Sequence, residues 1–177
     1  SGSEKSKLAG QLTSDDRTPQ LENELRAVQK ALPRKAVVLA AGKGKRLHPH
    51  TNNTPKPLLQ HQDQPILDYV LQALVYAGIE EVCLVTHYLG HQIEEYVGNG
   101  EKWGITASYR DQLEPLGSGH ALQSAADFLT EPCFVLASDY LLPPNFILDL
   151  KAAYLARAAD IGVSLKQLPT EELASRS

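Results

Sequence analysis

Apolar and polar positions follow two alternating patterns along this chain, and together they predict a sheet covered by helices. Strands are predicted at residues 36–41, 81–87, 105–110, 133–137 and 161–168, on the basis of short apolar runs that are typical of buried strands, such as those at 36–41, 82–85 and 133–137. Between them, apolar residues recur every three or four positions, which predicts amphipathic helices at 65–77, 90–97, 119–129 and 145–159. This alternation predicts an α/β fold of Rossmann-like type, with a mostly parallel sheet and helices on both faces.

Composition divides the chain into three parts. Residues 1–18 are polar and begin Ser-Gly-Ser, so we expect a mobile tail or the remnant of an expression tag. Residues 19–33 predict one amphipathic helix that ends at Pro33, either as a packing helix or as a separate interaction element. Residues 34–177 form the remaining domain, and a chain of 177 residues has room for about one domain.

Positive charge gathers in one segment of an otherwise acidic chain. The net charge is −4, which argues against a nucleic-acid-binding surface, and no apolar stretch approaches the ~20 residues of a membrane helix. Residues 36–62, however, contain no acidic residue and include Gly42, Gly44 and several cations. Glycines let the backbone turn so that its N–H groups form an anion site. The segment therefore predicts a bound anion.

The glycines of this segment fit neither common phosphate loop. The P-loop pattern is absent, and Leu47 stands where the dinucleotide fingerprint needs its third glycine. The chain instead reads Leu-Ala-Ala-Gly-x-Gly-x-Arg-Leu-x-Pro-x-Thr at 39–51, followed by Pro-Lys-Pro-Leu at 55–58. This combined pattern resembles the sugar-1-phosphate nucleotidyltransferases. A simple turn would explain the glycines and lysines alone, but not the arginine, threonine and prolines at this spacing.

The resemblance implies roles for the residues of both half-motifs. Arg46 would hold the triphosphate, and Lys56 would contact the transferred phosphate, the alternative being a solvated loop lysine. Lys43 and Lys45 are equally consistent with phosphate contact and with ordinary exposed lysines. The nucleotide site implied by the resemblance comprises Leu39, Ala40, Ala41, Gly42, Lys43, Gly44 and Lys45, with Gln112, Gly117 and Ser118 from a second block.

That second block, at 112–121, resembles the stretch of N-acetylglucosamine-1-phosphate uridyltransferases that contacts uracil. By this resemblance Gln112 and Gly117 are base contacts, and the favoured nucleotide is UTP or dTTP. Ser118 replaces the threonine of the family and could equally be a helix N-cap, and His120 reads as a structural residue. Guanylyl- and cytidylyltransferases share the first loop, so the base and the sugar remain open.

Asp139 follows the apolar run 133–137 and is the candidate metal ligand. A carboxylate beside a triphosphate is usually there for Mg²⁺, which takes one or two carboxylates together with phosphate oxygens. The family has an aspartate at this point, usually after glycine, where this chain has Ser138. The alternative is a loop aspartate that caps a turn.

The resemblance covers about residues 35–170, which is the nucleotide-binding half of the family's catalytic domain. The chain is therefore expected to be either a truncated or partly ordered form of a longer enzyme or a short relative that lacks full activity. In either case an open sheet edge would favour self-association. The main hypothesis is transfer of a nucleotidyl group from a nucleoside triphosphate to a sugar 1-phosphate, giving a nucleotide sugar and pyrophosphate. The alternatives are an inactive nucleotide-binding module and a scaffold domain. Two cysteines inside apolar runs predict buried thiols and a cytoplasmic setting.

Overall fold

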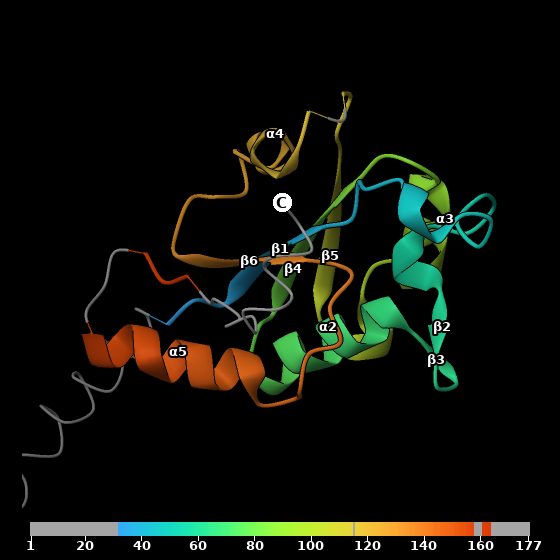
Figure 1. Ribbon diagram of the computed structural model, residues 1–177. Helices are drawn as coiled ribbons and strands as arrows, with labels where there is room; N and C mark the ends of the chain where they lie inside the picture. Colours follow the sequence, from blue (N-terminus) through green and yellow to red (C-terminus); the bar gives the residue numbers. More distant parts are fainter. Residues whose placement is uncertain (1–31, 115, 158–160, 164–177) are drawn as a thin grey trace, which may run out of the picture.

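The computed structural model describes residues 32–114, 116–157 and 161–163 (Figure 1). The predicted tail and most of the predicted N-terminal helix lie outside these ranges. In chain order the elements are β1 (Lys35–Leu39), the 3-10 helices η1 (Lys45–Leu47) and η2 (Lys56–Leu58), the short strands β2 (Gln60–His61) and β3 (Gln64–Pro65), α2 (Ile66–Tyr76), β4 (Glu81–Thr86), α3 (Gly90–Val97), η3 (Glu101–Trp103), β5 (Thr106–Asp111), α4 (Ser118–Ser124), β6 (Cys133–Ala137) and α5 (Phe146–Arg157).

The central sheet has the strand order β5-β4-β1-β6, and every neighbouring pair is parallel. Val37 of β1 lies opposite Cys83 of β4 on one side and Val135 of β6 on the other. The carboxyl ends of the strands consequently meet at one edge of the sheet, where ligands bind in open α/β folds. The predicted α/β fold with a parallel sheet is confirmed.

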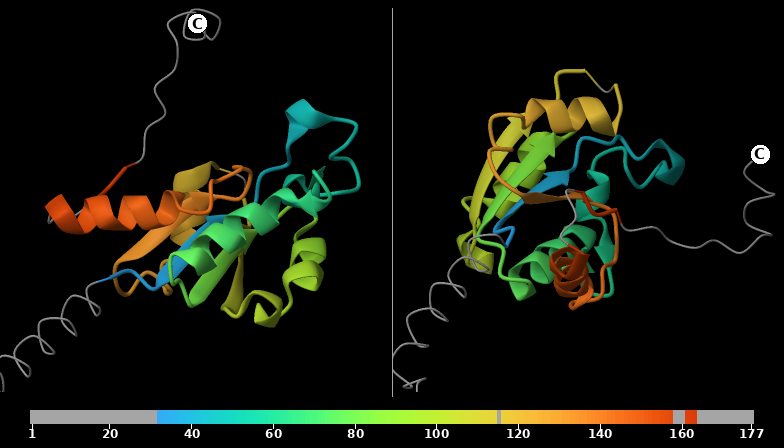
Figure 2. Two further views of the ribbon diagram at one scale, coloured as in Figure 1. Left: turned by 90° about the horizontal axis from the view of Figure 1, so that it is seen from below. Right: turned by 90° about the vertical axis from the view of Figure 1, so that its left-hand side faces the viewer.

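Helices cover both faces of the sheet, and alternate strand residues supply the two cores. Val38 and Leu84 belong to a core built with α2, α3 and α5. Val37, Cys83 and Val85 point to the opposite face, where α4 covers them. Figures 1 and 2 show α4 on one side of the sheet and α2 and α5 on the other. Burial on both faces explains why these strands read as unbroken apolar runs.

Three local predictions differ from the structure. The hairpin of β2 and β3 was not predicted; its turn places Gln62 and Asp63 at positive φ, which alternating apolar residues cannot signal. The helix predicted at 119–129 ends at Ser124, because the next N–H groups bond carbonyls three residues back, as in a tightened last turn. The predicted strand at 161–168 is not seen at 161–163, which form no strand, and its remainder lies outside the described residues.

β6 forms one edge of the sheet within the described residues. It pairs with β1 on one side, and the Val135 side chain is 45% exposed although it belongs to an apolar strand. The predicted open edge therefore exists in this part of the chain, while self-association through it remains a prediction. None of the helices in the described ranges has the length and apolar character needed to cross a bilayer.

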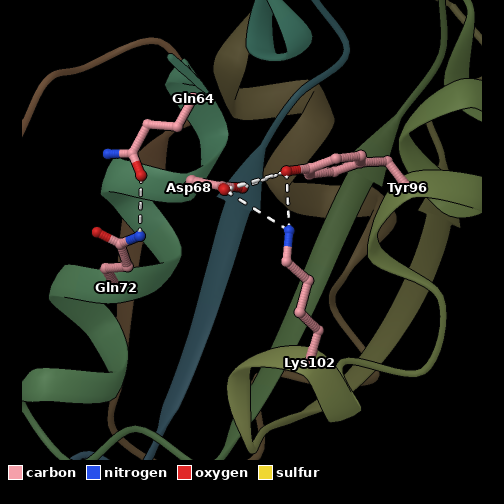
Figure 3. Close-up of polar contacts among 5 residues, drawn as sticks. All are labelled: Gln64, Asp68, Gln72, Tyr96 and Lys102. Carbon is pink, nitrogen blue, oxygen red and sulfur yellow. Dashed lines mark hydrogen bonds and ion pairs between the residues drawn. The ribbon is translucent and has the colours of Figure 1, made fainter. Parts of the chain in front are cut away.

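A polar network ties α2, α3 and η3 together beneath the sheet (Figure 3). Asp68 of α2 is only 6% exposed, and the Tyr96 hydroxyl donates to its two carboxylate oxygens at 2.9 and 3.0 Å. The Lys102 ammonium donates to the same hydroxyl at 3.0 Å and lies 3.7 Å from the carboxylate. The buried carboxylate thus keeps a donor and a counter-charge, which its burial requires.

Removing the Tyr96 hydroxyl is expected to destabilise the domain. Tyr96→Phe leaves the buried Asp68 carboxylate without its donor, and a lost bond to a charged group costs about 1.5–3 kcal/mol. Denaturant unfolding measures the change, with Tyr76→Phe at a tyrosine that is 61% exposed as the control. An unchanged unfolding midpoint in Tyr96→Phe would show that the network contributes nothing to stability.

Tyr109 of β5 is expected to ionise at a higher pH than an ordinary tyrosine. Burial, reinforced by the negative charge of Glu94, raises its pKa from 10.0 to about 12. Between these values the unfolded chain loses a proton that the folded protein keeps, so stability should fall as the pH rises from 10 to 12. Absorbance titration at alkaline pH should show a late phase that Tyr109→Phe removes and Tyr140→Phe, at an exposed tyrosine, retains.

Candidate functional site

A cavity of about 580 Å³ opens at the carboxyl ends of β1 and β6. Four segments of the chain build it: the loop after β1, η2, the turn into α4 and the end of β6. Its lining consists of Leu39, Ala41, Gly42, Lys43, Gly44, Lys45, Lys56, Pro57, Gln112, Gly117, Ser118, Ala121, Ala137, Ser138 and Asp139.

The loop after β1 folds back on itself around Gly44. This glycine has φ +59°, and a Cβ added to it would lie 3.0 Å from Thr51 Cγ2 and 3.3 Å from Lys56 Cβ. The Thr51 hydroxyl, which is fully buried, donates to the Gly44 carbonyl at 3.0 Å. The glycine and the threonine of the sequence pattern are therefore packed against each other, and their contact brings Lys56 to the cavity wall.

The far side of this loop is fixed to α3 and the turn before it. The Tyr88 hydroxyl donates to the Asn52 carbonyl at 2.7 Å, and Gln92 Nε2 donates to the Asn53 carbonyl at 3.0 Å. Lys43 Nζ lies 6.0 Å from the centroid of the Tyr88 ring, at the outer limit of a cation–π contact. These contacts restrain the position of the loop beside the cavity.

Lys56 and Asp139 form an ion pair within the cavity wall. Lys56 Nζ lies 2.5 Å from Asp139 Oδ2, and their side chains are 31% and 35% exposed. Asp139 is held in place through its neighbour, because the backbone N–H of the buried Ser138 donates to the Leu39 carbonyl at 3.0 Å. The predicted phosphate cation and the predicted metal carboxylate therefore contact each other.

Gln112 points inward and shapes the turn into α4. It is only 3% exposed, and its backbone N–H donates to the Thr86 carbonyl at 2.8 Å. Its Nε2 donates to the Gly117 carbonyl at 3.1 Å and lies 3.2 Å from His120 Nδ1. Gly117 has φ +102° and is the N-cap residue of α4, so the alternative of an N-cap at Ser118 is wrong.

The cavity brings together nearly all residues that the sequence predicted for the site. The exceptions are Ala40, which is buried behind the lining, and Arg46, which is exposed on η1 outside it. The cavity lining also contains four residues that the sequence did not predict for the site: Pro57, Ala121, Ala137 and Ser138. The rule that ligands bind at strand carboxyl ends indicates the last two.

A family model of nucleotidyl transferases matches residues 35–174. The chain belongs to the nucleotidyl transferase family. A glucose-1-phosphate thymidylyltransferase of Streptomyces griseus is 34% identical over 76% of this chain and 38% of its own length. The catalytic subunit beta of mannose-1-phosphate guanylyltransferase from Xenopus tropicalis is 40% identical over 60% of this chain and 31% of its own.

A solved UDP-glucose pyrophosphorylase from Acinetobacter baumanii superposes on this nucleotidyl transferase chain with a TM-score of 0.61 and 25% identity. The superposition covers 72% of this chain and 54% of that structure. The chain thus spans well under two thirds of the relatives that it matches. The resemblance drawn from residues 39–58 is confirmed.

The cavity of this nucleotidyl transferase chain has a positive lining. Among the described residues that line it, Lys43, Lys45 and Lys56 are positively charged and Asp139 is the one carboxylate. No cluster of three or more metal-ligating side chains occurs within the described ranges. A single carboxylate fits Mg²⁺ only where phosphate oxygens complete its coordination, as is usual for this ion. The donor set is therefore compatible with Mg²⁺ that arrives with a phosphate ligand.

Proposed function

We propose that the cavity binds a nucleoside triphosphate and that the protein transfers its nucleotidyl group to a sugar 1-phosphate. The products are a nucleotide sugar and pyrophosphate. The observation that carries the proposal is the convergence of the glycine loop, Lys56, Gln112 and Asp139 on one positively lined cavity. The relatives named above are thymidylyl- and guanylyltransferases of sugar 1-phosphates, which supports the same reaction.

The proposed roles of the residues follow from their charges. A phosphate oxygen of the sugar 1-phosphate attacks the α-phosphorus, a new P–O bond forms, and the bond to the bridging oxygen breaks as pyrophosphate leaves. Both substrates are anions, so Lys43, Lys45, Arg46 and Lys56 would neutralise and align them. Mg²⁺, held by Asp139, would supply further neutralisation of the phosphate charge. The backbone N–H groups of the loop after β1 would add neutral donors.

The base would lie toward the turn into α4. In this proposal Gln112, Gly117 and Ser118 form one side of the base site, and Leu39 and Ala41 at the strand end form the other, with Gly42 and Gly44 beside the phosphates. Gly117 and His120 fix Nε2 of Gln112, so the Gln112 amide would meet a pyrimidine base in one orientation. UTP and dTTP are the favoured nucleotides.

A panel of nucleotides tests the proposal. Thermal unfolding is measured with UTP, dTTP, GTP, CTP and ATP, each with and without Mg²⁺, and pyrophosphate release is assayed with sugar 1-phosphates. A ligand that binds only the folded state, and is present at about 100 times its Kd, adds roughly 2.7 kcal/mol to the free energy of unfolding, which is easily measured. A Mg²⁺-dependent rise with one or two nucleotides is expected. No rise with any nucleotide would contradict the proposal, and binding without turnover would favour a nucleotide-binding module.

The proposed setting is the cytoplasm. Cys83 and Cys133 are both free thiols. Burial raises the pKa of each thiol and keeps it protonated, and so unreactive. Free, unreactive thiols suit a reducing compartment.

A further inference from the structure

Lys56 and Asp139 form an ion pair, although the proposed function requires each of the two charges to bind a different ligand. Nζ and Oδ2 are 2.5 Å apart, and each side chain is about one third exposed, so ligands can reach both. In the proposed reaction the ammonium serves a phosphate and the carboxylate serves a divalent cation. Neither group can serve its ligand fully while it is engaged with the other.

Competition follows directly from this geometry. A divalent cation that takes Asp139 Oδ2 must displace the Lys56 ammonium, and a cation at the other carboxylate oxygen repels that ammonium at short range. A phosphate that takes the ammonium removes the counter-charge of the carboxylate and leaves it available to a cation. Each ligand therefore removes the obstacle to the other.

The backbone around the pair favours a side-chain exchange over a larger movement. Lys56 lies between Pro55 and Pro57, both buried, and its Cβ is close to the tight turn at Gly44. Asp139 follows the buried Ser138, which is bonded to Leu39. With both backbones fixed, rotation of the two side chains is sufficient to separate the charges.

We propose that the Lys56–Asp139 pair is an internal counter-ion switch that couples divalent-cation binding to triphosphate binding. The inference rests on the proposed function for the identity of the two ligands. The cation releases Lys56 to the phosphates, and the phosphates release Asp139 to the cation. Because binding free energies are linked, each ligand must strengthen the other by the same factor.

Binding of Mn²⁺ alone tests the first half of the switch. Free Mn²⁺ is quantified by its paramagnetic resonance signal, without nucleotide. Lys56→Gln is expected to bind Mn²⁺ about tenfold more tightly than the wild type, which is within the usual range of coupling factors. Lys45→Gln removes an equal charge from the same cavity, so it is the matched control for the effect on Mn²⁺ binding of losing one positive charge. The gain should disappear in Lys56→Gln combined with Asp139→Asn.

Triphosphate binding without metal tests the second half. Asp139→Asn releases Lys56, so inorganic tripolyphosphate should bind this variant more tightly than the wild type in the presence of a chelator. Added Mg²⁺ should then give Asp139→Asn much less benefit than it gives the wild type. Circular dichroism verifies that each variant is folded.

The outcomes separate this inference from the proposed function. If Lys56→Gln binds Mn²⁺ no more tightly than Lys45→Gln, the switch is overturned even where the wild type binds nucleotide. If the wild type binds no triphosphate under any condition, the proposed function fails, and the Mn²⁺ comparison still decides whether Lys56 restrains the carboxylate.

Discussion

Replacing Gly44 with valine is expected to destabilise the domain by about 3 kcal/mol and to remove nucleotide binding. Gly44 has φ +59°, a conformation in which a β-branched residue is a genuine outlier. Its new Cβ would also lie 3.0 Å from Thr51 Cγ2, and Thr51 is fully buried and cannot easily give way. Relief of this contact would move the Thr51 side chain or the backbone that carries Lys56.

Gly42→Val is the matched control for this prediction. It lies two residues away in the same loop, but a Cβ at Gly42 meets no atom within 4 Å. Its expected effect on stability is within about 0.5 kcal/mol, as for most exposed substitutions. Denaturant unfolding of both variants makes the comparison. Equal losses of stability at Gly42 and Gly44 would show that the close packing against Thr51 is not what requires glycine.

The sequence predicted the sheet well because burial on both faces leaves a strong signal. The runs at 36–41, 81–87, 105–110 and 133–137 became β1, β4, β5 and β6 with small changes at their ends. The hairpin of β2 and β3 left no such signal, because its strands have two residues each and are largely polar. The early end of α4 depends on backbone bonds, which an apolar pattern does not encode.

The sequence predicted most of the residues that form the site but not the directions of their side chains. Residues that end parallel strands, or follow them, gather at one edge of the sheet, which is why Gly42 and Asp139 lie at the same end. Spacing could not reveal that Asp139 pairs with Lys56, since that depends on the direction of two side chains. It also could not reveal that Gln112 turns inward, where its amide is used by the turn into α4.

The predicted site and the observed cavity differ most at Arg46. The family pattern assigns it the triphosphate, yet it is exposed on η1 and does not line the cavity. Leu47 N–H donates to the Gly44 carbonyl at 2.8 Å, so the backbone on both sides of Arg46 is held. Only rotation of its long side chain could bring the guanidinium to a phosphate at the cavity mouth. Variants of Arg46 therefore test the role in triphosphate binding that the family pattern gives to this arginine.

Arg46→Ala is expected to weaken triphosphate binding roughly 10- to 100-fold, the loss of one or two charge-assisted hydrogen bonds. Arg46→Lys should recover only part of this affinity, because an ammonium lacks the planar fork that matches phosphate oxygens. Titration calorimetry with UTP or dTTP and Mg²⁺ measures both variants. The difference in triphosphate affinity between Arg46→Ala and the wild type should become smaller at high salt, because the Arg46 side chain is exposed.

Arg34→Ala is the control, because Arg34 is an exposed arginine just before β1, at the opposite end of the strand from the cavity, where it pairs with Glu80. Its triphosphate affinity should match the wild type. If Arg46→Ala also matches the wild type, the phosphates are held without the arginine, by the lysines and the backbone N–H groups of the loop. The cation that the family pattern places on the triphosphate would then be a surface residue of this chain, and Lys56 would be the principal charge available to the phosphates.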